Sequence, residues 1–111
     1  MLPHAAPYNA LLRIDNCSQV LPKPFEKPRQ EFDFWVLELP VLEGEDFNQW
    51  AQRTVKLLLL HEQTLKSLCE ADASLTLFIA NSCTSPAFRV ETLFLQILSR
   101  MQISLEFSIT E

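Results

Sequence analysis

The side chain best suited to chemistry in this sequence is the imidazole of His61. When the residues around it are placed on a helix, His61 falls within the apolar side, near Leu57, Leu58 and Leu65. A buried histidine can act as a base, a metal ligand or a pH switch. No second ligand or nucleophile stands at helical spacing from it. This favours a histidine in the core or at its boundary, with a functional histidine as the alternative.

The cysteines do not complete a metal site with this histidine. Cys17, Cys69 and Cys83 show no CxxC spacing, and an odd number of cysteines is typical of reduced thiols in a cytoplasm rather than of disulfides. A metal site would need His61 together with Cys69, Cys83 or His4, and Cys69 lies two helical turns away, too far for an i, i+4 pair. We therefore expect Cys69 to be a small buried residue, and we expect neither metal nor cofactor.

Acidic residues and glycine give no sign of a catalytic site. Glu43, Glu45 and Asp46 precede an expected helix, where they suit the positive end of the helix dipole. A general acid–base pair needs one carboxyl group in an apolar pocket, which nothing in the sequence indicates. Gly44 is the only glycine, which excludes a P-loop, a Rossmann fingerprint and a GxSxG elbow. We therefore expect no catalysis; the alternative is a small enzyme built around His61.

Length and charge set broad limits on the class of protein. The 111 residues suit a single domain, 1–111, with one core. The 14 acidic and 9 basic residues give a net charge of −5, which argues against nucleic-acid binding and would suit a basic partner. No stretch approaches the roughly 20 apolar residues of a membrane span, and no signal peptide is evident. We expect a soluble, cytoplasmic protein without a membrane partner.

Hydrophobic periodicity predicts strands that alternate with helices. Apolar residues recur at every second position in four segments, residues 8–15, 32–39, 74–81 and 103–110. The second of these segments is apolar on both faces. The element order β-β-α-β-α-β predicts an α+β fold, a two-layer sandwich of a four-stranded mixed sheet with two helices on one face. The order of the strands within the sheet stays open.

Two amphipathic helices are expected to cover that sheet. The first is one long helix over residues 46–72, with its first residue as N-cap and Gln49 completing a capping box. The second is capped by Thr84 or Ser85 and ends near Met101. Each helix has one apolar stripe, so both can be buried against the same face of the sheet.

A basic, proline-rich segment lies between the first two strands. Residues 21–30 contain three prolines and three basic residues, and this density of proline precludes a helix or a central strand. The segment is therefore predicted to be an extended loop. It is either a stiff connector with solvated charges, which we favour, or a basic docking loop.

More apolar residues are present than one core requires. Leu59, Leu60 and Leu95 lie outside the stripes of their helices. The open face of the sheet is expected to carry a further patch, which consists of Leu11, Trp35, Leu37, Leu39 and Phe78. Such a patch exceeds what a monomer usually exposes. It indicates either a contact with another protein or a second copy, or cover by the proline-rich loop or the termini.

Three features together carry a family resemblance. They are the Phe34-Trp35 strand before a long leucine-rich helix, the short strand after it, and the closing unit FLQILSRMQISLEF at residues 94–107. In these features the last two thirds of the chain resembles a family of small bacterial α+β domains of unknown function. The resemblance implies no activity and no catalytic residues. The chain departs from the family where a proline-rich loop replaces a helix after the first strand.

These patterns together predict a non-catalytic domain that binds another protein or forms a homodimer. By analogy with other small acidic bacterial domains, a more specific alternative is an immunity-type inhibitor that neutralises a basic toxin.

Overall fold

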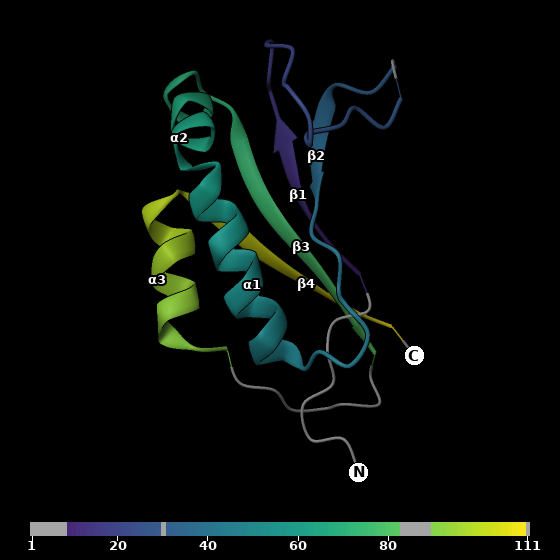
Figure 1. Cartoon of the computed structure of the whole chain (residues 1–111). Helices are drawn as coiled ribbons and strands as arrows, with labels where there is room; N and C mark the ends of the chain where they lie inside the picture. The colour runs from purple at the N-terminus through teal and green to yellow at the C-terminus, as the bar shows by residue number, and fades with distance from the viewer. Residues whose placement is uncertain (1–8, 30, 83–89, 111) are drawn as a thin grey trace.

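The computed structural model describes residues 9–29, 31–82 and 90–110, and it consists of one sheet beside a layer of helices (Figure 1). The elements in chain order are β1 (Asn9–Asp15), β2 (Phe34–Glu38), α1 (Phe47–Leu60), α2 (Glu62–Glu70), β3 (Ser74–Ser82), α3 (Thr92–Arg100) and β4 (Ile103–Thr110).

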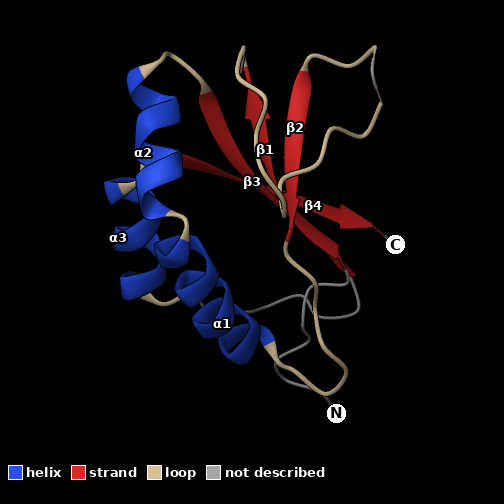
Figure 2. Ribbon diagram, turned by 45° about the horizontal axis from the view of Figure 1, so that its top comes forward, coloured by secondary structure: helices blue, strands red, loops and turns tan. Residues whose placement is uncertain are grey.

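The strands form a four-stranded mixed sheet in the order β2-β1-β3-β4. β1 is antiparallel to both of its neighbours, whereas β4 is parallel to β3. A parallel pair requires a crossover between its strands, and α3 provides it. All helices lie on one face of the sheet (Figure 2), which confirms the predicted two-layer sandwich.

The prediction of one long helix over residues 46–72 is wrong in one respect. The helix is broken at His61 into α1 and α2. His61 has φ −106° and ψ 19°, and its amide donates to the carbonyl oxygen of Leu58 at 3.1 Å. His61 and Glu62 occupy the position where the buried stripe passes between Leu58 and Leu65. A straight helix would direct these two polar side chains at the sheet, whereas the break leaves both only half-buried.

The ends of the other elements also differ from the prediction. The second of the two predicted helices is α3. It begins at Thr92, with Glu91 as its N-cap, so Val90 lies outside it. The predicted caps Thr84 and Ser85 fall outside the described residues. β2 covers only the middle of the predicted 32–39 strand, whereas β4 has the predicted bounds.

The N-terminus of α1 carries the predicted capping box. Asp46 Oδ1 accepts from the backbone N–H of Gln49 at 2.8 Å, and Gln49 Oε1 accepts from the backbone N–H of Asp46 at 3.0 Å. Two otherwise unpaired amide groups at the start of the helix are thereby satisfied.

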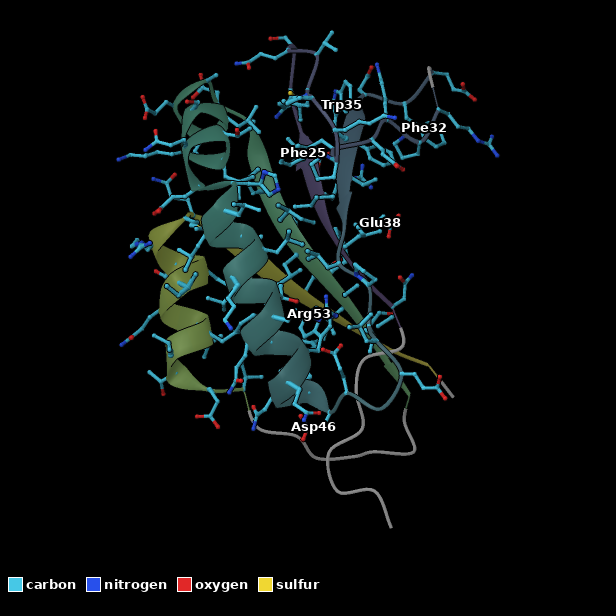
Figure 3. All side chains as sticks on the ribbon, viewed as in Figure 1. Phe25, Phe32, Trp35, Glu38, Asp46 and Arg53 are labelled. Carbon is cyan, nitrogen blue, oxygen red and sulfur yellow. The ribbon has the colours of Figure 1, made fainter. Side chains whose placement is uncertain are left out.

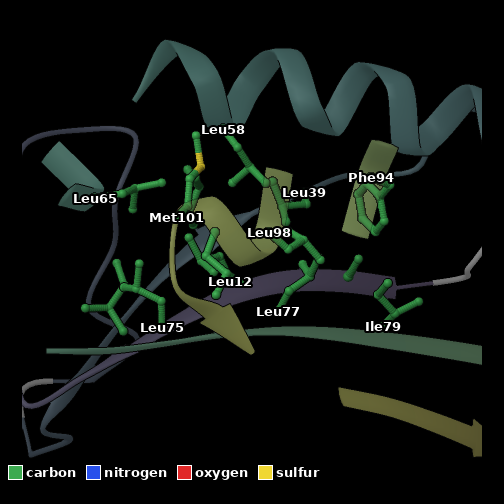
Figure 4. Packing of buried hydrophobic residues seen from close by; sticks show 14 of the residues in the cluster. Leu12, Leu39, Leu58, Leu65, Leu75, Leu77, Ile79, Phe94, Leu98 and Met101 are labelled. Carbon is green, nitrogen blue, oxygen red and sulfur yellow. The ribbon is translucent and has the colours of Figure 1, made fainter. Parts of the chain in front are cut away.

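The core lies between the helices and the sheet, and it is built mainly of leucine (Figure 4). Trp50 is fully buried, and its indole Nε1–H donates to the carbonyl oxygen of Leu39 at 3.2 Å. The rings of Phe47 and Phe94 lie 5.6 Å and 6.1 Å from the Trp50 ring. This aromatic cluster joins α1 to α3, and the hydrogen bond joins α1 to the end of β2.

Candidate interaction surface on the open sheet face

The structure places three residues of the predicted open-face patch on the helix side of the sheet. In the pairing of β1 with β2, Leu37 lies opposite Leu12 and Trp35 lies opposite Ile14. Leu37 and Leu39 are each 1% exposed and belong to the core, and Trp35 packs against it. Placing these three on the open face was therefore wrong. Because β2 is apolar on both faces, its alternation does not say which face points inward.

Leu11 and Phe78 lie on the face that the helices leave open, where they are paired across β1 and β3. The same register places Glu38 of β2 beside Leu11 and Glu106 of β4 beside Phe78. One line across all four strands thus reads Glu38, Leu11, Phe78, Glu106. We call this line the central row.

The central row has apolar residues in the middle and a carboxylate at each end. Leu11 and Phe78 are half-buried, whereas Glu38 and Glu106 are exposed. Within the described part of the chain, neither carboxylate accepts a hydrogen bond or forms an ion pair.

A second row runs beside the central row. Its central residue is Arg13, which forms an ion pair with Asp15 of the same strand. Arg13 lies between Val36 and Thr76 in register. Its guanidinium is 3.9 Å from the centre of the Phe34 ring, and its Nε donates to both carboxylate oxygens of Asp15 at 3.1 Å. Val36 is buried although it lies outside the core cluster. Arg13 and Asp15 thus largely neutralise each other on this face.

An aromatic stack lies beside the second row, where Phe34 of β2 is opposite Asp15 of β1. The rings of Phe32 and Phe34 are 5.2 Å apart and nearly parallel. The guanidinium of Arg29 lies 5.6 Å from the centre of the Phe32 ring and 3.8 Å from Glu31. Sequence reasoning missed this stack because cation–aromatic contacts depend on where the loop folds back.

The proline-rich loop protects the outer edge of β2 rather than the central row. The backbones of Glu26 and Val36 exchange two hydrogen bonds, of 2.8 Å and 2.7 Å. Leu21 and Phe25 of the loop are buried in the core. Figure 3 shows Phe25 on the helix side of β2 and Glu38 on the other side. The described part of the loop thus pairs with the backbone of β2 and anchors Leu21 and Phe25 in the core.

His61 lies half-buried at the junction of α1 and α2. Its ring meets the edge of the Phe25 ring, with the centroids 5.3 Å apart. No hydrogen bond to the imidazole is found among the described residues. The same part of the chain contains no group of three or more His, Cys, Asp or Glu side chains that could hold a metal. His61 therefore contributes an aromatic contact between the loop and the helices.

The two described cysteines are separate from each other and from His61. Burial raises the pKa of the Cys69 thiol, which donates to the carbonyl oxygen of Met101 at 3.6 Å. Cys17 lies in the loop after β1 and donates to the carbonyl oxygen of Gln19 at 3.4 Å. Cys83 and His4 fall outside the described residues. Cys69 is thus a protonated, partly buried side chain near neutral pH.

The strongest ion pair joins Glu45, which precedes α1, to Arg53, which lies within α1. Arg53 donates to both carboxylate oxygens of Glu45 at 2.8 Å and also to the carbonyl oxygen of Pro40. These hydrogen bonds, with one from the backbone N–H of Leu42, lower the pKa of Glu45 to about 2. The predicted role for Glu45 was the helix dipole, whereas the structure uses it to hold the β2–α1 connection against the helix.

The outer surface of the helical layer carries the surplus leucines. Leu60 is 76% exposed and Leu95 is 44% exposed, on α1 and α3 respectively. A groove between these helices, about 500 Å³ in volume, has Ala51, Val55 and Phe94 in its lining. The lining also contains one cation, Lys56, and one anion, Glu91, so the charges of this groove favour neither an acidic nor a basic occupant.

The chain was compared with protein families, curated proteins and solved structures. No family model, curated protein or solved structure matches the chain.

Within the described ranges, no helix is both long enough and apolar enough to cross a bilayer.

Proposed function

We propose that this domain binds another protein through the open face of its sheet and catalyses no reaction itself. The observation that carries the proposal is the central row, in which two half-buried apolar side chains are flanked by two exposed carboxylates. Apolar residues surrounded by polar ones are the usual arrangement of a protein–protein contact.

The charges on this face favour a basic partner. The chain has a net charge of −5, and the arginine beside the central row is already paired with Asp15. Glu38 and Glu106 therefore present negative charge that a lysine or arginine from outside can neutralise. Charge complementarity of this kind speeds association and selects the partner.

A homodimer through the same face is the competing form of the proposal. When the central rows of two copies are aligned about a twofold axis, carboxylates face carboxylates, which is unfavourable. We therefore expect light scattering of the pure protein to give the monomer mass of 12.8 kDa. A dimer that dissociates on Leu11→Ser substitution would support the homodimer instead.

An immunity-type inhibitor is the more specific form that the acidic face supports. Such an inhibitor covers the basic active surface of a toxin, so it needs exposed carboxylates around an apolar contact. The central row offers both. This assignment rests on analogy of charge and size, and isolation of a basic toxin bound to this chain in the host tests it.

Capture of partners from the host tests the proposed function when variants are compared. The open-face variant carries Leu11→Ser and Phe78→Ser, and the control variant carries Leu60→Ser and Leu95→Ser on the helical layer. We expect the wild type and the control to retain the same basic protein, and the open-face variant to lose it while its circular dichroism spectrum is unchanged. Retention by the open-face variant, or loss by the control, would contradict the proposal.

A further inference from the structure

We propose that the partner is recognised through an extended segment that crosses the strands, with two basic residues four positions apart and an apolar residue midway. This inference rests on the proposed function, to which it adds the shape and charge pattern of the ligand.

The spacing of the central row selects this pattern. Its four members lie on four adjacent strands. Neighbouring strands are about 4.8 Å apart, so Glu38 and Glu106 are separated by roughly 14 Å across the sheet. In an extended chain, residues i and i+4 are also about 13–14 Å apart, and their side chains point to the same side. The side chain at i+2 then meets the sheet between Leu11 and Phe78.

A helix matches this spacing less well. A separation of about 14 Å along a helix corresponds to roughly nine residues, at a rise of about 1.5 Å per residue. Nine residues turn the helix by about 900°, which places the two side chains on opposite sides. A partner helix could therefore engage one carboxylate of the central row directly but would direct the second cation away from the sheet.

The neighbouring row fixes where the segment lies. The second row ends at Val36 on β2 and at Ser104 on β4, so a segment shifted onto that row would find no carboxylate under either of its cations. On the other side of the central row, Ala80 and Ser108 are paired and offer no charge. Cationic side chains are thus directed to the central row, where the exposed carboxylates of Glu38 and Glu106 lie.

Two peptides of identical composition test this pattern by NMR titration of the full chain at low ionic strength. The matched peptide is Ac-Ser-Lys-Thr-Leu-Thr-Lys-Ser-NH2, and the control peptide is Ac-Ser-Lys-Lys-Thr-Leu-Thr-Ser-NH2. We expect the matched peptide to shift the amide signals of Leu11, Phe78 and their neighbours, with an affinity at least five-fold higher than that of the control peptide. We expect the double substitution Glu38→Gln, Glu106→Gln to remove the difference.

The possible outcomes separate this inference from the proposed function. Equal shifts of the open-face signals by both peptides would overturn the spacing argument while still supporting the open face as a contact surface. A preference that persists in the double variant would overturn the role of the two carboxylates. Absence of shifts on the open face with either peptide would overturn the inference, and the capture experiment above would then decide the proposed function separately.

Discussion

Leu11 of β1 and Phe78 of β3 lie opposite each other on the face of the sheet that carries no helix. The next residue along β1, Leu12, points to the other side and is fully buried in the core. Adjacent residues of one strand therefore have different roles, one in the core and one on the open face.

Substitution of Leu11 and of Leu12 by alanine should have very different effects on folding. Leu12→Ala leaves a cavity in the core, and we expect it to lower the free energy of unfolding by about 2–5 kcal/mol. Leu11→Ala removes a half-buried side chain from an open surface, and we expect a loss below about 1 kcal/mol. Urea denaturation of both variants measures this difference. Equal losses would show that the faces of β1 are assigned incorrectly.

The pair of Glu45 and Arg53 should make stability depend on pH in the acidic range. The pKa of Glu45 is lowered from 4.5 to about 2 in the folded protein. A lowered pKa means that the pair stabilises the fold fully above about pH 4.5 and that this contribution is lost as the pH falls toward 2. We expect Glu45→Gln to cost about 1 kcal/mol at pH 7, because Arg53 is partly exposed to solvent.

Thermal unfolding of wild type and Glu45→Gln between pH 2 and pH 7 measures this effect. The two proteins should differ at neutral pH and converge near the lower end of the range. Glu31→Gln is a suitable control, since Glu31 is 66% exposed and its arginine lies 3.8 Å away. If Glu31→Gln destabilised the protein as much as Glu45→Gln does, the special role of the Glu45 pair would be refuted.

His61→Ala should change stability rather than an activity. The edge contact between His61 and Phe25 joins the loop to the α1–α2 junction, and such aromatic pairs contribute about 0.5–1.5 kcal/mol beyond the burial of their area. A double-mutant cycle with His61→Ala and Phe25→Leu measures this coupling. The prediction fails if an activity is found that His61→Ala removes while the protein stays folded.

The sequence was sufficient for the features that depend on local pattern. The alternation in β4, the capping box at Asp46 and the sandwich of one sheet and one helical layer were predicted and are found. The break at His61 was not predictable in the same way, because no glycine or proline marks it. It coincides with the point where two polar residues, His61 and Glu62, interrupt the apolar stripe between Leu58 and Leu65.

The candidate surface was predictable only in part. In β1 and β3, apolar and other residues alternate in a way that separates the two faces, so Leu11 and Phe78 were placed correctly. β2 is apolar on both faces, and Leu37 was therefore placed on the wrong face. If Leu37 were on an open surface, Leu37→Glu would leave the fold intact. Because Leu37 is buried, we expect Leu37→Glu to unfold the domain by placing a charge in the core. The pairing of Glu38 and Glu106 with the apolar residues depends on the strand order, which pattern alone does not give.

Charge reversal on the open face tests the central claim most directly. Glu38→Lys with Glu106→Lys changes the net charge from −5 to −1, since each substitution adds two positive charges. Glu43→Lys with Glu70→Lys makes the same change at two exposed residues away from the open face. Comparing these variants at equal net charge separates the effect of the central row from that of overall charge.

The decisive measurement is the affinity of the captured basic partner for wild type and for both charge-reversed variants, each checked for folding by circular dichroism. We expect the open-face reversal to weaken binding more than ten-fold and the control reversal to change it less than three-fold. Equal weakening by the two variants, or unchanged affinity in the open-face variant, would contradict the account of the sheet face as the site of binding.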